Sequence, residues 1–190
     1  MRSILLLGFF TFFFLPACKD SKTKEKDRFP DEIRKEESDK KPGSESGNSQ
    51  FSITAPEGWT KKDTFMMGQQ ITFLISPQED PSDDFKENVN VVTEKTGSIN
   101  INDYLDKSIT TLKNVLNNFV QGNISNLSIN GLEFKKMQYS HVYGGVPIDV
   151  NVYFTVKEGM GYVITGSAKG GTISKWEPRF EEAVQSFRIY

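Results

Sequence analysis

The sequence predicts an α+β domain over residues 51–190, with a mainly antiparallel central sheet. Two observations lead to this prediction. Short alternating apolar segments precede a single amphipathic helix, and further alternating segments joined by glycine turns lead to a second helix. Runs of strands with few helices between them are typical of antiparallel sheets, not of alternating α/β folds. About 140 residues are enough for one domain with its own core.

The first strands are predicted from alternation. Phe51 and Ile53 alternate with polar neighbours before Pro56 stops the segment. Residues 70–76 (QITFLIS) and 88–96 (NVNVVTEKT) are rich in β-branched side chains and are separated by a polar loop. We therefore expect three short strands before the first helix.

A change of period then predicts a helix. Asn102 suits its N-cap position and Gly122 its exit. Apolar residues follow at spacings of four and three, which is the pattern of one buried helix face: Leu105, Ile109, Leu112, Leu116 and Phe119.

Strands joined by tight turns follow this helix. Residues 124–129 (ISNLSI) run into a turn at Asn130-Gly131, and further turns fall at Gly144-Gly145 and Lys157–Gly159. The segments between and after these turns alternate, so we expect an antiparallel meander. On residues 146–156 the alternation assigns one group to one face and a second group to the other: Ile148, Val150, Val152 and Phe154 against Asp149, Asn151 and Tyr153.

The chain closes with a helix over residues 174–187. Its predicted inner face carries Trp176, Phe180 and Val184, with Phe187 as a further candidate. Pro178 fits only the first turn of a helix, so we expect the helix to begin near Trp176.

The order of these segments resembles that of PsbP-like domains, which include the photosystem II extrinsic subunit and DcrB-type lipoproteins. The resemblance is carried by FSITAPEGWT, NVNVVTEK, DYLDKSITTL, INGLEFKKMQY and FEEAVQSFRI, in that order. It covers nearly all of residues 51–190 and implies an α/β/α sandwich. It implies no single function, because one fold can host unrelated roles.

The first residues resemble a bacterial lipoprotein signal. Arg2 precedes an apolar run over residues 4–15, which is too short to span a bilayer but has the size of a signal-peptide core. Residues 15–18 (LPAC) then resemble the lipobox. This resemblance implies that residues 1–17 are cleaved off and that Cys18 is lipidated. An ordinary cleaved signal with an unrelated cysteine is the alternative.

Residues 18–50 comprise this cysteine and a charged segment with only two large apolar residues, Phe29 and Ile33. Such a composition cannot bury enough apolar surface to offset chain entropy, so we expect a disordered tether with a span of about 30 Å. A short recognition element near Phe29 or Ile33 is a second possibility. Lys19 follows Cys18 where an aspartate would signal inner-membrane retention, which favours the outer membrane.

The domain offers few groups for catalysis. His141 is the only histidine, and its neighbour Ser140 points to the opposite face of an alternating strand, so a triad with Asp149 is not expected. One histidine and one lipidated cysteine cannot supply a zinc site of the usual composition. We therefore expect no catalytic residue, no metal ligand and no cofactor.

Three further segments have a functional interpretation and a simpler one. Residues 168–172 (AKGGT) lack the order of a phosphate-binding loop. Trp59, Trp176 and Met66-Met67 are expected to be packing residues, with a ligand pocket near Trp59 as the minority alternative. The acidic residues of one loop could hold calcium or manganese weakly, but a solvated loop is the simpler interpretation: Glu79, Asp80, Asp83 and Asp84.

These observations predict a lipoprotein of the bacterial cell envelope whose domain is a non-catalytic binding or assembly module. The alternative is an accessory protein that binds a small ligand or a divalent metal. The expected partners are the membrane, through lipid on Cys18, and an envelope protein. The mildly acidic net charge of −2 gives no electrostatic case for nucleic acid.

Overall fold

The structure, a computed structural model of the chain, describes residues 51–66, 69–83 and 85–190. The elements in chain order are β1 Phe51–Ser52, β2 Thr60–Met66, β3 Gln69–Ile75, β4 Asn88–Lys95, α1 Ile101–Val115, β5 Asn117–Ile129, β6 Leu132–Tyr143, β7 Val146–Lys157, β8 Met160–Lys169, α2 Ile173–Gln185 and β9 Arg188–Ile189. The predicted signal peptide, the lipidated Cys18 and the tether lie outside the described residues.

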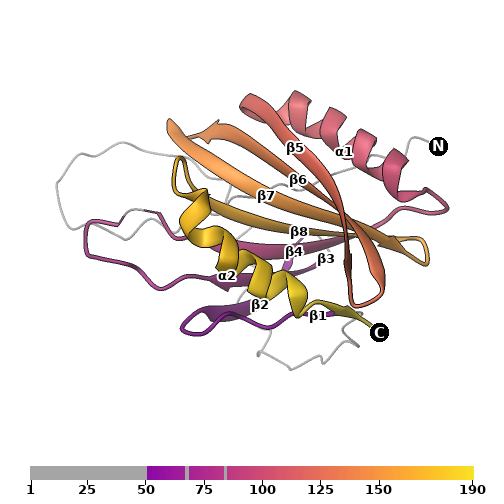
Figure 1. Cartoon of the computed structure of the whole chain (residues 1–190), viewed down its shortest axis with the longest axis horizontal. Coiled ribbons are helices and arrows are strands. Elements are labelled where there is room, and N and C mark those ends of the chain that lie inside the picture. The colour runs from indigo at the N-terminus through magenta and orange to yellow at the C-terminus, as the bar shows by residue number, and fades with distance from the viewer. Residues whose placement is uncertain (1–50, 67–68, 84) are drawn as a thin grey trace, which may run out of the picture.

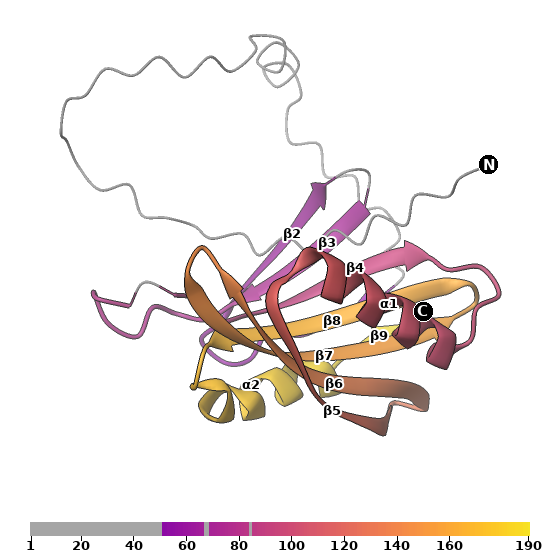
Figure 2. The ribbon, with the colours of Figure 1, turned by 90° about the horizontal axis from the view of Figure 1, so that it is seen from above.

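Seven strands form one antiparallel sheet in the order β2-β3-β4-β8-β7-β6-β5. Figure 2 looks onto the sheet from the α1 side and shows β2 and β5 at its two edges. A second, two-stranded sheet pairs β1 with β9 in antiparallel register. The predicted α+β class with a mainly antiparallel sheet is confirmed.

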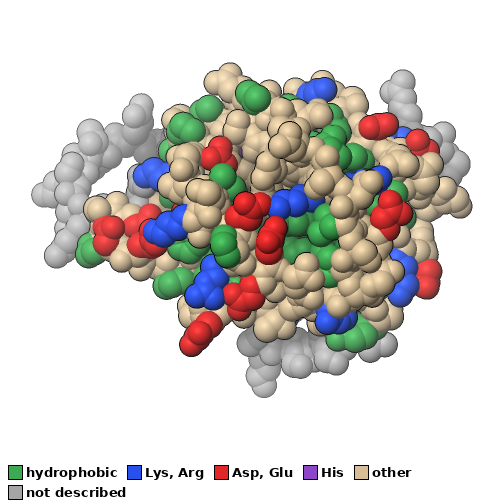
Figure 3. All heavy atoms as spheres, in the orientation of Figure 1, with side chains coloured by type: hydrophobic (Ala, Val, Ile, Leu, Met, Phe, Trp, Pro, Cys, Tyr) green, Lys and Arg blue, Asp and Glu red, His purple; other side chains and the backbone are tan. Residues whose placement is uncertain are grey.

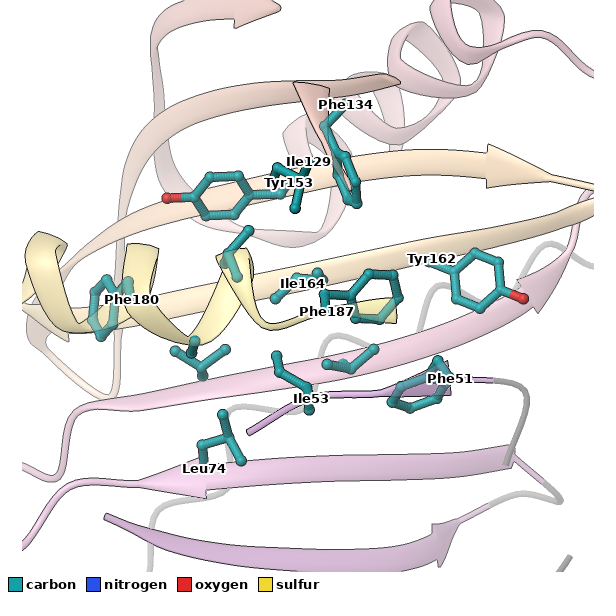
Figure 4. Close-up of a cluster of buried hydrophobic side chains, with 14 of the residues drawn as sticks. Phe51, Ile53, Leu74, Ile129, Phe134, Tyr153, Tyr162, Ile164, Phe180 and Phe187 are labelled. Atoms are coloured by element: carbon teal, nitrogen blue, oxygen red, sulfur yellow. The ribbon is translucent and has the colours of Figure 1, made fainter. Parts of the chain in front are cut away.

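One helix covers each face of the large sheet (Figure 1). The α1 side is filled by residues such as Tyr104, Leu112 and Phe154. The α2 side is filled by residues such as Phe134, Ile164 and Phe180. Figure 4 shows side chains of this second cluster, drawn from strands and from α2, converging between sheet and helix. The α/β/α arrangement that the PsbP-like resemblance implied is therefore present.

The three turns of the meander adopt the backbone that their residues favour. Asn130, Gly131, Gly144, Gly145 and the Glu158-Gly159 pair all have positive φ angles, between 53° and 84°. Two consecutive residues with positive φ are what a two-residue type I′ hairpin turn requires, and this turn matches the twist of the strands. Local chemistry thus sets the β5–β6, β6–β7 and β7–β8 hairpins.

Helix α1 differs from the prediction at both ends. Its N-cap is Asn100, not Asn102, and the Asn100 Oδ1 accepts hydrogen bonds from the N–H groups of Asn102 and Asp103. The helix ends at Val115, well before Gly122. Phe119 lies on β5, where its ring packs on Tyr139 at a centroid distance of 5.3 Å. The spacing from Leu116 to Phe119 fits a helix, but the apolar contact is made from a strand.

Two more differences concern the ends of the domain. Strand β2 falls in a stretch for which no strand was predicted. Helix α2 begins at Ile173, so Pro178 lies in its interior and not in its first turn. Pro178 and Ser174 are both exposed, so water can replace the hydrogen bond that proline cannot donate to the Ser174 carbonyl. Phe187 is buried as expected, but it follows the end of the helix.

Candidate functional site

Beneath α2 lies a group of polar side chains that we call the α2 polar cluster: Lys136, Asn151, Tyr153, Glu177 and Glu181. Lys136 of β6 stands directly opposite Tyr153 of β7 in the sheet. Asn151 precedes Tyr153 by two residues on β7, so both side chains lie on the same face. Glu177 and Glu181 are four residues apart on α2, so both carboxylates point to one side of the helix.

Lys136 connects the sheet to the helix. Its Nζ lies 2.7 Å from Glu177 Oε1 and 3.0 Å from Glu181 Oε1. Asn151 Nδ2 donates to the same Glu177 oxygen, with an N···O distance of 3.1 Å. The Lys136 ammonium also lies 5.5 Å from the centre of the Tyr153 ring. The cluster is therefore a set of fixed pairs that hold α2 against β6 and β7.

Two buried atoms of the cluster are left over. Asn151 Oδ1 and the Tyr153 hydroxyl are buried and form no hydrogen bond of standard geometry with the described residues. An unpaired buried polar group costs on the order of 1–3 kcal/mol, so their presence opposes the stability that the ion pairs supply. A polar group kept at that cost is worth testing for a role in binding.

The surroundings of Lys136 and Tyr153 keep both side chains protonated. Burial would lower the pKa of Lys136, but its hydrogen bonds to Glu177 and Glu181 outweigh burial and raise that pKa above its usual value. Burial raises the pKa of Tyr153 to about 12, although the nearby Lys136 opposes the shift. Lysine and tyrosine thus both keep their protons at neutral pH and present no nucleophile.

His141 lies on the opposite side of the sheet from this cluster. It is 4% exposed, its ring stacks near Tyr139 at 5.9 Å, and its Nδ1 has no hydrogen-bond partner among the described residues. Burial lowers the pKa of His141, so the ring is neutral at neutral pH. Ser140 stands opposite Asp149, while His141 stands opposite Ile148. The sheet keeps His141 apart from Ser140 and Asp149, as predicted.

The acidic loop is tied down by its own contacts. Glu79 forms a salt bridge with Lys175 of α2. Asp80 accepts hydrogen bonds from the backbone and side chain of Ser82, and these bonds lower the pKa of Asp80. Asp83 accepts from the N–H of Glu79 at 3.2 Å. Asp84 lies outside the described residues. Within the described part of the chain no group of three or more acidic, histidine or cysteine side chains could hold a metal ion.

Sequence reasoning missed Glu87, which follows this loop. Glu87 is 5% exposed and its Oε2 has no hydrogen-bond partner among the described residues. Burial raises the pKa of Glu87, and the nearby charges of Asp83 and Glu79 raise it further. The only signal in the sequence is that Glu87 alternates with Val89 and Val91, which predicts that all three share a face.

The remaining predicted residues have structural contacts. Trp59 and Trp176 pack on each other at 5.9 Å, as expected for packing anchors. In the loop 168–172, the Gly171 N–H donates to Asp149 Oδ2 at 2.7 Å, which fixes the start of α2 to β7. The side chains of Met66-Met67 lie outside the described residues.

No helix in the described ranges is long and apolar enough to cross a bilayer. Figure 3 shows charged side chains of both signs mixed over α2, and mostly uncharged side chains along β5.

No protein-family model matches this sequence, and no curated protein matches it either. Solved structures do resemble the fold. The structure of LpqN from Mycobacterium tuberculosis, described as involved in cell envelope biogenesis, matches with a TM-score of 0.57 and 16% identity over 73% of this chain and 82% of that one. PA94 from Pseudomonas aeruginosa, a protein of unknown function, matches with a TM-score of 0.56 and 14% identity over 73% of this chain and 96% of that one.

The solution structure of cyanobacterial PsbP from Synechocystis sp. PCC 6803 matches with a TM-score of 0.48 and 15% identity, over 77% of this chain and 96% of that one. A TM-score below 0.5 does not establish a common fold, so the PsbP-like resemblance rests on the order of the sequence segments. At these identities the likeness to LpqN and PA94 is one of fold alone.

Proposed function

We propose that this protein is a bacterial lipoprotein whose PsbP-like domain is a non-catalytic binding or assembly module of the cell envelope. The observation that carries the proposal is the lipobox-like sequence 15–18 at the end of an apolar run of signal-peptide size. Each buried methylene of an acyl chain adds about 0.8 kcal/mol of membrane affinity, and stable anchoring takes more than one chain. A diacylglyceryl group on Cys18 would meet that requirement.

The polar groups of the described domain support a non-catalytic role. Lys136 is neutralised by two carboxylates, Tyr153 keeps its proton, and His141 is buried away from Ser140. A general base must reach the proton it removes and have a suitable pKa, and these groups do not meet both conditions. The similar fold of LpqN, described as involved in cell envelope biogenesis, agrees with an envelope role. Because Lys19 and not aspartate follows Cys18, we propose the outer membrane where the cell has one.

The anchor is tested by labelling cells with palmitate and comparing the wild-type chain with Cys18→Ala. We expect the wild-type chain to take up label, to partition into the detergent phase, and to accumulate as a precursor in the presence of globomycin. The Cys18→Ala chain should take up no label, should not partition into the detergent phase, and should remain an unlipidated precursor with or without globomycin. Wild-type protein that carries no label and stays in the aqueous phase would refute the anchor.

A second candidate function is binding of a divalent cation or small ligand. The observation that favours it is Glu87, a buried carboxyl group whose Oε2 has no hydrogen-bond partner among the described residues. Calcium and manganese prefer such oxygen ligands. Thermal melting with millimolar Ca²⁺ or Mn²⁺ tests it, with Glu87→Gln as the matched variant. A rise in the melting temperature of the wild-type chain that the variant lacks supports binding, because a ligand stabilises the state that binds it. An equal response of both chains contradicts it.

A further inference from the structure

Strand β5 is an open edge of the large sheet. Among the described residues it pairs with β6 on one side only, and ten of its thirteen residues are exposed. Its outer side therefore presents backbone N–H and C=O groups that no neighbouring strand satisfies. Figure 2 shows β5 as the outermost strand on its side of the sheet.

The composition of β5 differs from that of the opposite edge. Its thirteen residues, NNFVQGNISNLSI, contain no charged side chain and no proline, in a chain that is 25% charged. The other edge, β2, has seven residues and carries Lys61, Lys62 and Asp63. Natural sheets protect their edges with short strands, charges and proline. By this measure β2 is protected and β5 is not.

Part of β5 is regular enough to accept another strand. Its register against β6 shifts between Asn117 and Val120 and again between Gln121 and Ile124. From Ile124 to Ile129 the pairing continues without a shift. The last six residues thus form an ordinary strand edge, whereas the two irregularities protect the first half.

We propose that β5 of one copy pairs antiparallel with β5 of a second copy, which joins the two large sheets into one. A strand paired with its own copy across a two-fold axis meets the same residues on both sides. Asparagine and serine both donate and accept hydrogen bonds, so like can pair with like. A charged strand such as β2 would instead bring equal charges together, which is unfavourable.

The alternation of side chains restricts the register. Ser125 and Leu127 face the α2 side of the sheet, because they stand opposite Lys136 and Phe134. Ile124, Asn126 and Ser128 face the α1 side. In an antiparallel pair, two residues that stand directly opposite each other lie on the same face of the sheet. The two-fold axis therefore lies at one residue, which stands opposite its own copy, and not between two successive residues of the strand. The axis at the middle of Ile124–Ser128 passes through Asn126.

With the axis at Asn126, no charged side chain of β5 meets another. Asn126 stands opposite Asn126 of the second copy, Ser125 opposite Leu127, and Ile124 opposite Ser128. Ile124 is 42% exposed in the single copy, and the pairing would cover it. The segment 19–50 of the same chain is a poor alternative occupant, because its lysine, aspartate, glutamate, glycine and proline residues are disfavoured in strands.

Single cysteine substitutions at residues 125, 126 and 127 test the pairing in the full chain purified in mild detergent. Directly opposite residues have Cα atoms about 4.5–5.5 Å apart, within the range of a disulfide. We expect Asn126→Cys to give a disulfide-linked dimer under mild oxidation, and Ser125→Cys and Leu127→Cys to give far less. The wild-type chain, whose only cysteine is Cys18, sets the background. Asn114→Cys, at an exposed position of α1, is the control for random collision.

A single maximum among residues 125–127 supports the pairing, and its position gives the axis. No dimer at any of the three, equal yield at all of them and at Asn114→Cys, or a product with a protein of different mass overturns it. The experiment does not depend on the lipid anchor. The same three substitutions made on the Cys18→Ala chain leave one thiol per chain, so failure of the pairing and failure of the anchor are read separately.

Charge variants give a second readout by light scattering. Ile124→Lys with Ser128→Lys places two lysine pairs across the axis and should weaken the dimer roughly tenfold. Ile124→Glu with Ser128→Lys places opposite charges there and should restore it. Equal dimer content in both double variants contradicts the register centred on Asn126.

Discussion

Replacing Gly166 with alanine should loosen helix α2 from the sheet. Gly166 lies on β8 under the ring of Phe180. A Cβ added at Gly166 would lie 2.6 Å from Phe180 Cδ2 and 2.7 Å from Cγ, whereas ordinary contact begins at 3.4 Å. The Phe180 ring is fully buried and packs edge-on against Trp59 at 6.2 Å. It therefore has no free space to enter, and the helix has to move.

Overpacking of a core costs about 1–3 kcal/mol, and we expect the upper end because strand backbone lies on one side of the contact. For a domain of this size, about 3 kcal/mol corresponds to a fall of roughly 6–12 °C in melting temperature. Urea unfolding followed by tryptophan fluorescence measures the change. Both tryptophans of the chain, Trp59 and Trp176, lie at this contact, so the native emission should shift as well.

The matched control is Gly161→Ala. Its added Cβ would lie 2.7 Å from Tyr104 on the α1 side of the sheet, so it should destabilise the domain without changing the native tryptophan emission. Phe180→Leu shortens the ring that Gly166→Ala strikes. The double variant should therefore be more stable than the sum of the single effects by about 1 kcal/mol. Additive effects, or a Gly166→Ala variant within about 0.5 kcal/mol of wild type, would refute the close contact.

Three further predictions follow from described contacts. Asn130 donates hydrogen bonds to the carbonyls of Gln185 and Phe187, so Asn130→Gly should lower the free energy of unfolding in urea by about 1–2 kcal/mol. Asn130→Ala should lower it further, because alanine is strained at the φ of 54° that this residue adopts. Lys136→Met removes the cation beside Glu177, which then keeps only the hydrogen bond from Asn151, and should cost about 1–3 kcal/mol. Neutralising Glu181, whose side chain is 52% exposed, should cost under about 0.5 kcal/mol. Equal effects would contradict the central place of Lys136. Burial lowers the pKa of His141 in the folded state. Below pH about 6.5, the usual pKa of histidine, the unfolded chain therefore binds a proton that the folded chain does not. The free energy of unfolding should fall as the pH falls through this range. His141→Phe should reduce the difference between urea midpoints at pH 7.5 and pH 5.5, and an unchanged difference would argue against this assignment.

The sequence predicted those parts of the fold that local chemistry decides. The hairpin turns follow from Asn130-Gly131 and the later glycines, and the two faces of β7 follow from strict alternation. Strand β2 was not predicted, because an exposed edge strand does not need alternating apolar residues and its charged residues are typical of a loop. The end of α1 was predicted too late in the chain, because Phe119 matches the helical spacing of apolar residues although it lies on β5.

The polar contacts beneath α2 are of a different kind. The alternation of β7 predicted that Asn151 and Tyr153 share a face, but it could not predict what covers them. Their partner Glu177 comes from α2, and Lys136 meets it across 41 positions of sequence. Such contacts depend on how the helix packs on the sheet, so no pattern within either segment contains them. Glu87 was missed for a related reason, because only the packed structure shows that its carboxyl group is buried.

The pairing of β1 with β9 places Phe51 beside Ile189. Phe51 and Ile53 are both buried in the folded domain. Because synthesis proceeds from the amino end, the β9 residues that pair with β1 are made only when nearly the whole domain is complete. During synthesis the apolar side chains of Phe51 and Ile53 are therefore the first of the domain to be made and among the last to be covered. Slow synthesis of the final residues would therefore prolong the exposure of both side chains.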